Sequence, residues 1–260
     1  MRLEVGAVPG EAERRVQVQT AAQALGLALD DVVLDRLMAY LQLLQRWNQV
    51  YNLTALRDPA LMLSHHLVDC LAVLPALRRW AAIGEAAAAA DGGAGAGNAA
   101  SPRALRILDV GSGGGLPGVV LAAVEPAWQV ACVDTVAKKA GFIRQVAAEL
   151  RMPNLQGLHA RVENLQPPPV LVPAGGAGGQ PAAAGYDLIT SRAFASLPDF
   201  TRLSAHLLAP GGVWMAMKGK PPDDEQAALP PGVAVFHVEH LQVPGLDAQR
   251  CLVWMRRKTD

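Results

Sequence analysis

The chain has 260 residues, of which 51% are hydrophobic and 18% are charged, and its 23 basic residues balance its 23 acidic residues. This apolar content excludes a wholly disordered chain, and a formal net charge of zero gives no support to an extended nucleic-acid-binding surface. Any contact with RNA would therefore depend on local clusters of basic side chains. No apolar run reaches the ~20 residues that cross a bilayer, and the first 15 residues mix acids and bases. We therefore expect no signal peptide, no membrane association and a cytoplasmic location.

Residues 1–80 are predicted to form a small helical unit. Apolar positions recur at helical spacing between Thr20 and Trp47, and Asp30 is a candidate N-cap for the second helix of this region. A further short helix is predicted for Ala60–Leu77. The leucines that define the helical stripe are Leu34, Leu37, Leu41 and Leu44.

Two segments are rich in small residues and proline. Residues 81–104 are mainly alanine and glycine, and we interpret them as a flexible linker in which Ala81–Ala90 could extend the preceding helix. Residues 167–185 combine three consecutive prolines with a glycine-rich stretch. Such a long connection is predicted to be an exposed insertion.

Residues 105–260 alternate between short apolar runs and helical patterns, which is typical of a doubly wound sheet. We predict a Rossmann-like α/β fold, with a mostly parallel sheet, a closing antiparallel hairpin and the helical unit in front of it. The predicted parallel strands are Leu105–Val110, Gln129–Val133, Leu155–Ala160, Tyr186–Thr190 and Gly212–Lys218, a helix is predicted for Val136–Leu150, and the hairpin strands are Val233–Val238 and Cys251–Met255.

A glycine-rich turn follows the first predicted strand, and residues 109–118 read DVGSGGGLPG. In a doubly wound sheet, ligands bind outside the carboxyl ends of the strands. A dinucleotide fingerprint would place its third glycine at position 116, which is Leu116 here. The glycines instead alternate at Gly111, Gly113 and Gly115, a variant that suits an adenosyl amino acid without a pyrophosphate. A tight turn without a ligand is the alternative.

Further candidate site residues follow the next three strands. Asp134 ends the second strand, where a carboxylate can accept hydrogen bonds from both ribose hydroxyls, although an aspartate there is often a helix cap or a turn residue instead. Val162 and Glu163 follow the third strand, close to where an adenine would lie. Arg192 follows the fourth strand, where its planar fork could hold a methionyl carboxylate or an RNA phosphate, or form a surface salt bridge. Lys218, at the end of the fifth strand, is the basic residue best placed to contact RNA.

Neither cysteines nor histidines form a metal-binding motif. The three cysteines are scattered without a CxxC pair, and His65 and His66 point to different faces of a helix. We therefore expect no bound metal.

At these motifs the chain resembles the small-subunit ribosomal RNA methyltransferase G family, also called the glucose-inhibited division protein B family. The glycine turn alone would fit any methyltransferase of this fold, whereas the asparagine-leucine-threonine and serine-arginine-alanine blocks narrow the resemblance to one family. It extends from about Asp30 to the C-terminus. The matching segments are Trp47–Thr54, His66–Asp69, Asp109–Gly118, Asp134–Thr135 with Lys138–Lys139, Arg161–Glu163, Ser191–Ala195, Lys218–Gly219 and Leu241–Val253.

The resemblance implies methyl transfer from S-adenosyl-L-methionine to N7 of the guanine at position 527 of bacterial 16S ribosomal RNA, in the small ribosomal subunit or a precursor of it. The family's cofactor contacts correspond to Gly111, Leu116, Val162, Glu163 and Arg192. The departures are modest, since Cys70 and Thr135 stand where serine is usual.

The expected chemistry requires no general base, because guanine N7 carries a lone pair and no proton. Orientation of the two reactants should dominate catalysis. His66 and Asp69, which lie in a family segment, are therefore expected to act through packing or RNA positioning, and no catalytic residue is assigned. Two alternatives stay open, namely an S-adenosylmethionine-dependent methyltransferase with another substrate and a non-catalytic RNA-binding protein of ribosome assembly.

Overall fold

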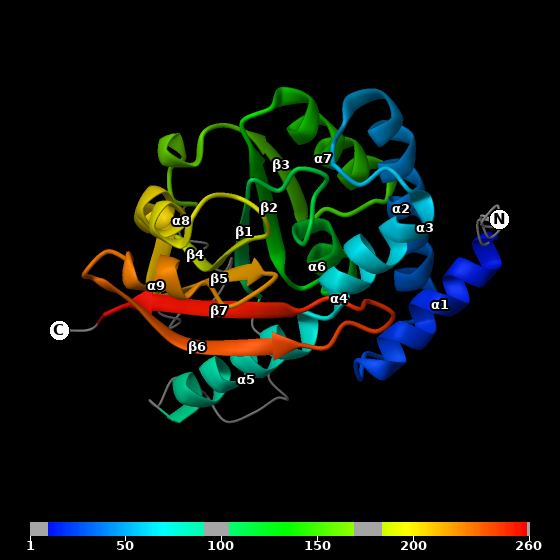
Figure 1. Cartoon of the computed structure of the whole chain (residues 1–260). Helices are drawn as coiled ribbons and strands as arrows, with labels where there is room; N and C mark the ends of the chain where they lie inside the picture. The colour runs from blue at the N-terminus through cyan, green and yellow to red at the C-terminus, as the bar shows by residue number, and fades with distance from the viewer. Residues whose placement is uncertain (1–9, 91–103, 169–183, 259–260) are drawn as a thin grey trace, which may run out of the picture.

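The computed structural model describes residues 10–90, 104–168 and 184–258, and a single seven-stranded sheet is its centre (Figure 1). The strand order is β3-β2-β1-β4-β5-β7-β6. The first five of these are mutually parallel, whereas β7 runs antiparallel to both β5 and β6. This topology confirms the predicted Rossmann-like α/β fold with its closing hairpin. The strands are β1 (Arg106–Val110), β2 (Gln129–Asp134), β3 (Leu155–His159), β4 (Tyr186–Ser191), β5 (Leu208–Lys218), β6 (Val233–Leu241) and β7 (Arg250–Arg257).

The central strands are buried on both faces, which explains their continuous apolar sequences. All five residues of β1 are buried, and so are all six of β4. Along β1, Ile107 contributes to one hydrophobic core and Leu108 to the other, because alternate side chains point to opposite faces. Helices α6 (Gly118–Val124) and α7 (Ala137–Glu149) pack on the first face. Helix α8 (Leu197–Ser204) packs on the second, and the short α9 (Asp223–Ala227) contacts α8.

The N-terminal helices share the core of the first face. Helix α1 covers Glu11–Ala24 and α2 covers Asp31–Tyr51, and the predicted leucine stripe of α2 is buried. The carboxylate of Asp30 accepts a hydrogen bond from Val33 N at 2.8 Å, which confirms the predicted N-cap. Helix α2 packs against α6 and α7, so its side chains join those of the sheet in one hydrophobic cluster. The domain boundaries at residues 80 and 105 stay predictions.

The region predicted as one short helix over Ala60–Leu77 is divided in the structure. It contains α3 (Pro59–Met62), a π-helical segment (Leu63–Val68), α4 (Asp69–Leu71) and the start of α5 (Leu74–Ala90). Helix α5 therefore includes residues 81–90, the part of the predicted linker for which a helical extension was left open. The remainder of that linker, 91–103, and most of the predicted insertion, 169–183, lie outside the described residues.

The described helices include none that is both long and apolar enough to cross a membrane.

Candidate active site

The glycine turn has a backbone conformation that residues other than glycine disfavour. The φ angles of Gly111, Gly113 and Gly115 are +68°, +57° and +89°, all in the left-handed region. Gly111 also has no room for a side chain, since a Cβ there would lie 2.7 Å from the ring of Phe194. The alternating glycines are therefore required by the fold of the turn.

Hydrogen bonds attach this turn to its neighbours. The N–H groups of Gly111 and Ser112 donate to Val133 O at the end of β2, at 2.9 and 3.2 Å. From the opposite side, the hydroxyl of Tyr40 on α2 donates to Gly114 O at 2.7 Å. The turn is thus held between the sheet and the N-terminal helices before any ligand binds.

Asp109 lies beneath the turn, fully buried at the end of β1. Its Oδ2 accepts the N–H of Gly118 at 2.9 Å, so it anchors the first residue of α6. Burial raises the pKa of this carboxyl to about 7, and the hydrogen bond from Gly118 only partly offsets that effect.

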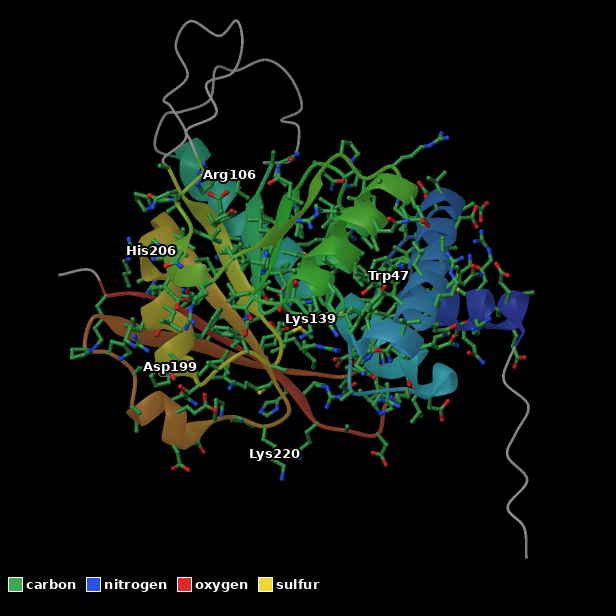
Figure 2. All side chains as sticks on the ribbon, turned by 90° about the horizontal axis from the view of Figure 1, so that it is seen from above. Trp47, Arg106, Lys139, Asp199, His206 and Lys220 are labelled. Atoms are coloured by element: carbon green, nitrogen blue, oxygen red, sulfur yellow. The ribbon has the colours of Figure 1, made fainter. Side chains whose placement is uncertain are left out.

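Two adjoining cavities flank the turn, and both are lined by Gly111, Lys139 and Ala193. The larger has a volume of about 640 Å³ and the smaller about 390 Å³, within the roughly 300–1,000 Å³ typical of small-molecule sites. Seen from above, Lys139 lies between Trp47 on α2 and Asp199 on α8 (Figure 2). Of the residues that line both cavities, Gly111 follows β1 and Ala193 follows β4, so the cavities lie at the carboxyl ends of the parallel strands.

All seven sequence-predicted cofactor residues line one cavity or the other. The larger cavity is lined by Gly111, Gly113, Leu116 and Arg192, and the smaller by Gly111, Asp134, Val162 and Glu163. The structure thus brings together residues from four separate strand ends, although their contacts with a ligand stay a prediction.

Asp134 already has local hydrogen-bond partners. Its Oδ2 accepts the N–H of Gly113 at 3.1 Å, and its Oδ1 accepts the N–H of Val136 at 2.9 Å. The ammonium of Lys139 lies 3.6 Å from Oδ2. The aspartate therefore ties the glycine turn to the start of α7, as expected of a turn residue, whereas the N-cap of α7 is Val136. A carboxylate has about four acceptor positions, so ribose hydroxyls can still bind to it.

Val162 and Glu163 begin a short 3₁₀ turn after β3. Val162 is buried, whereas the Glu163 side chain is one-third exposed and accepts a hydrogen bond from Arg161 Nε at 2.7 Å. Hydrogen bonds from its own backbone N–H and from Arg161 lower the pKa of Glu163. The smaller cavity thus combines an apolar wall with an ionised carboxylate.

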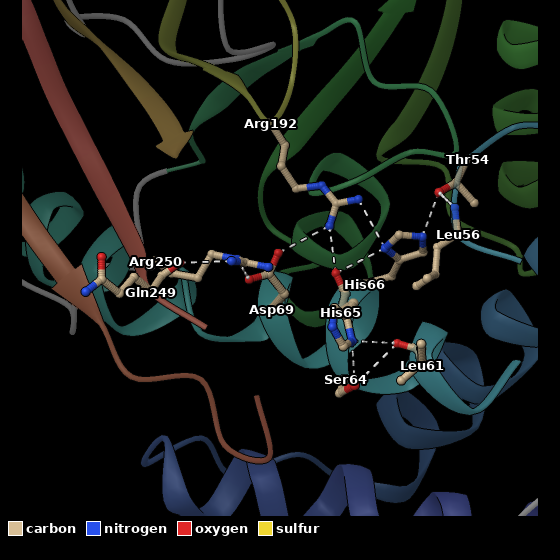
Figure 3. Close-up of polar contacts among 10 residues, drawn as sticks. All are labelled: Thr54, Leu56, Leu61, Ser64, His65, His66, Asp69, Arg192, Gln249 and Arg250. Carbon is tan, nitrogen blue, oxygen red and sulfur yellow. Dashed lines mark hydrogen bonds and ion pairs between the residues drawn. The ribbon is translucent and has the colours of Figure 1, made fainter. Parts of the chain in front are cut away.

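Arg192 lies at the centre of a polar network in the larger cavity (Figure 3). Its Nη1 donates to His65 O at 2.9 Å and to the Asp69 carboxylate at 3.2 Å, and its Nη2 lies 3.2 Å from His66 Nδ1. Asp69, with a side chain only 3% exposed, also accepts from Arg250 Nε at 2.8 Å. Arg192 is therefore held in place by an ion pair, as one interpretation of the sequence expected, but the pair is with a buried carboxylate and not at the surface. A contact of Arg192 with cofactor or RNA stays a prediction.

His66 is held by contacts on both ring nitrogens. Its Nε2 lies 2.8 Å from the hydroxyl of Thr54, in the loop after α2, and its Nδ1 faces Arg192. Burial, with the nearby guanidinium as the second cause, lowers the pKa of His66 from 6.5 to about 4. The ring is therefore neutral at physiological pH. The π-helical segment, a wide turn often found at functional sites, supplies both His65 and His66.

Two further basic residues line the larger cavity beside this network. Lys218, the predicted RNA contact, forms an ion pair with Glu225 on α9, with its Nζ 3.0 Å from both carboxylate oxygens. Arg250 was missed by residue-level reasoning from the sequence. The predicted hairpin could have located it, because an antiparallel β7 returns its first residue to the carboxyl edge of the parallel strands.

The chemistry of the site fits an adenosyl amino acid. Asp134 and Glu163 provide acceptors for hydroxyl and amino groups in the smaller cavity, and Arg192 provides a cation for a carboxylate in the larger. Within the described residues, no group of three or more histidine, cysteine or acidic side chains is arranged to hold a metal ion.

The parallel sheet, the glycine turn and the paired cavities are the features of an S-adenosylmethionine-dependent methyltransferase. The family model of rRNA small subunit methyltransferase G matches residues 33–105 and 98–253. The chain belongs to this family. It is 53% identical over 240 residues to "Ribosomal RNA small subunit methyltransferase G" of Paracidovorax citrulli (strain AAC00-1), covering 92% of this chain and 88% of that protein. It is 54% identical over 238 residues to the protein of the same name from Leptothrix cholodnii (strain ATCC 51168 / LMG 8142 / SP-6), covering 92% and 93% respectively.

Proposed function

We propose that this protein methylates N7 of the guanine at position 527 of 16S ribosomal RNA, with the small ribosomal subunit or its precursor as substrate. Family membership supports the choice of ribosomal RNA. The observation that carries the proposal for this chain is the pair of adjoining cavities at the glycine turn, because a cofactor can extend from the smaller cavity to Arg192 in the larger one, whose volume leaves room for a guanine beside it. Bound S-adenosylmethionine supplies the methyl group.

The protein's own residues would act mainly by holding the reactants. Gly111 and Gly113 place no side chain at their positions in the turn. The adenosyl part of the cofactor would bind at Asp134, Val162 and Glu163. Arg192, fixed by Asp69 and His65, would receive its carboxylate. A guanine placed in the larger cavity would then meet the methyl group at the shared boundary, and alignment of this kind accounts for most of the expected rate enhancement.

The hydrogen bonds of His66 and Asp69 support guanine N7, and not an exocyclic amino group, as the atom that is methylated. His66 is neutral, but both of its nitrogens have partners, and the Asp69 carboxylate lies between two guanidinium groups. Neither residue is therefore available to remove a proton. Guanine N7 requires no such acceptor, whereas an exocyclic amine must lose a proton.

The test is methyl transfer in vitro to small subunits from a strain that lacks the modification. Nucleoside mass spectrometry after site-specific digestion should detect 7-methylguanosine at position 527 with the wild-type protein and none with Gly113→Val. Methylation of another nucleotide or atom would favour the alternative of a methyltransferase with another substrate. Tight binding to small subunits without any transfer would favour an assembly factor.

A further inference from the structure

The carboxyl edge of the sheet is divided between two groups of residues. The predicted cofactor residues follow β3, β2, β1 and β4, which are consecutive in the sheet. Lys218 and Arg250 occupy the same edge at β5 and β7, beyond β4, where Lys218 pairs in register with Cys251. Neighbouring strands lie about 4.8 Å apart, so β7 is about 14 Å from β1 whereas β4 is one spacing away. The β5–β7 part of the edge is therefore left for the second substrate.

Arg250 is held in place and still has donors to offer. Its Nε donates to Asp69 Oδ1 at 2.8 Å and its Nη1 to Gln249 O at 2.9 Å. Among the described residues, Nη2 has no hydrogen-bond partner. The side chain is 23% exposed and lines the larger cavity. A guanidinium has five N–H donors, so the Arg250 side chain keeps donors on Nη2 that are already held in position and can bind an incoming anion.

The local charge balance favours an anion at Arg250 over Lys218. Both oxygens of Glu225 lie 3.0 Å from the Lys218 ammonium, so this cation has a carboxylate of its own. Arg250 instead shares the single carboxylate of Asp69 with Arg192 (Figure 3). Two guanidinium groups and one carboxylate leave one positive charge in excess at the cavity wall. The carboxylate that Arg192 would receive does not cancel it, because the cofactor also carries an ammonium and a sulfonium.

We propose that Arg250 binds a phosphate group of the RNA substrate and that Asp69 is the positioning residue that orients it. The planar guanidinium fork matches phosphate oxygens in pairs, which a lysine ammonium cannot do. This inference rests on the proposed function, because it takes the second substrate to be RNA. An oriented cation of this kind would contribute one local phosphate contact in a chain whose formal net charge is zero.

The experiment compares Arg250→Gln and Arg250→Lys with a matched control, Arg256→Gln. Arg256 lies on the same strand, but its guanidinium packs over the ring of Phe236, 5.2 Å from the centroid. For each full-length protein, binding to unmethylated small subunits is measured over a series of salt concentrations, and S-adenosylmethionine affinity is measured by calorimetry.

We expect Arg250→Gln to raise the Kd for small subunits about tenfold at low salt. The slope of log Kd against log salt should fall by about 0.7–0.9, the loss of one phosphate contact. Arg250→Lys should keep the wild-type slope with weaker binding, because it retains the charge and loses the fork. Cofactor affinity should stay within twofold of wild type for all three variants, and Arg256→Gln should bind subunits as wild type does.

An unchanged salt slope in Arg250→Gln would overturn the proposal. A loss of cofactor affinity equal to the loss of subunit affinity would also overturn it, because Arg250 would then serve the cofactor carboxylate. If Arg250→Gln does not fold, Arg250→Lys decides the matter, since wild-type affinity in that variant contradicts a fork-to-phosphate contact. A failure of the proposed function looks different, because the wild-type protein itself would then leave position 527 of the small subunit unmethylated, whatever its affinity for the particle.

Discussion

Asp69 and Arg192 form a contact of 3.2 Å across 123 residues of sequence, and this contact joins the N-terminal helices to the carboxyl edge of the sheet. Asp69 begins α4, directly after the π-helical segment, while Arg192 follows β4. Since the carboxylate is buried and the guanidinium lines the larger cavity, the N-terminal region helps to shape the site. The helical region is therefore a part of the active-site architecture and not an appendage to it.

The first prediction concerns the loss of this carboxylate. Asp69→Asn should lower the free energy of unfolding by about 2–3 kcal/mol, because it leaves two adjacent guanidinium groups without a counter-charge. The loss should be smaller than for a fully buried pair because both arginine side chains are 23% exposed and partly screened by solvent. Cofactor affinity should also fall, since Arg192 loses its fixed orientation. Urea unfolding and calorimetric titration measure the two effects.

A matched control is Asp35→Asn, which removes an exposed ion pair with Arg15. Exposed pairs contribute about 0–1 kcal/mol, so this variant should unfold close to wild type and bind the cofactor normally. Equal destabilisation by the two substitutions would contradict the role assigned to Asp69.

The second prediction concerns the glycine turn. Gly113→Val should abolish S-adenosylmethionine binding. A branched residue disfavours the φ of +57°, and Gly113 lines the larger cavity, so the new side chain would occupy space at the site. Its Cβ would lie 3.4 Å from Leu53 O. The control is Gly26→Val, whose φ is +71° and whose surroundings are open. Both substitutions should cost stability of about 1–2 kcal/mol, the left-handed backbone cost, but only the first should affect calorimetric cofactor binding. Binding lost in both variants would assign the effect to misfolding.

A third prediction separates the two interpretations of Asp134. If ribose hydroxyls bind the carboxylate, Asp134→Ala should weaken cofactor binding by ~1–3 kcal/mol, the cost of unpaired donors. A dideoxy analogue without the ribose hydroxyls should then lose clearly less affinity in the variant than the cofactor does, because only the loss of the bonds to Gly113 and Val136 affects it. If the carboxylate only ties Gly113 to Val136, both the cofactor and the analogue should lose affinity together. Calorimetry with the two ligands distinguishes these outcomes.

Much of this site was predictable because its residues lie directly after strands. A glycine pattern, an aspartate and an arginine at successive strand ends must meet at one edge of a parallel sheet, so the positions of Gly111, Asp134 and Arg192 follow from the strand order. The π-helical segment was not predictable. Its apolar pattern over Ala60–Leu77 matches an ordinary helix, and the contacts that His66 and Asp69 make there are with Arg192, more than 120 residues away.

The hydrogen-bond and ion-pair partners of the charged site residues could not be predicted from the sequence either. Arg192 was open to three interpretations because its partners, His65 and Asp69, lie more than 120 residues away. Lys218 looked available for RNA, yet the short α9 brings Glu225 against it. The end of a predicted strand gives the position of a charged residue in the fold. The residue that pairs with it can lie in a loop or a short helix, and no local sequence pattern specifies where that loop or helix runs.

The fourth prediction is a pH-dependent stability from Asp109. Its folded pKa of about 7 lies above the ordinary value of 3.8, so the folded protein holds a proton that the unfolded chain releases. Stability from this group is therefore present at low pH and is lost as pH rises from about 4 to 7, by at most roughly 1.4 kcal/mol per pH unit. Asp109→Asn should remove that decline, as measured by urea unfolding without cofactor between pH 4.5 and 8.

His66 provides the internal comparison, since its pKa is shifted the other way. The folded pKa of about 4 lies below 6.5, so the unfolded chain binds a proton that the folded protein excludes. Its contribution is present above pH 6.5 and is lost as pH falls toward 4. His66→Gln should therefore flatten the acid side of the curve, whereas Asp109→Asn changes the slope with the opposite sign. The same change in both variants would contradict this assignment.

The last prediction is a methylation rate that is nearly independent of pH. Guanine N7 has no proton to lose, and the two residues best placed to accept one are both engaged, His66 by Thr54 and Arg192 and Asp69 by two arginines. Single-turnover rates with small subunits at saturating cofactor should therefore vary by less than about twofold from pH 6.5 to 9. His66→Gln should lower the rate through loss of positioning, while the profile stays flat. A wild-type rate that rises tenfold per pH unit, with that slope absent from His66→Gln, would show that His66 accepts a proton. The reacting atom would then carry a proton in the substrate, as an exocyclic amine does and N7 does not.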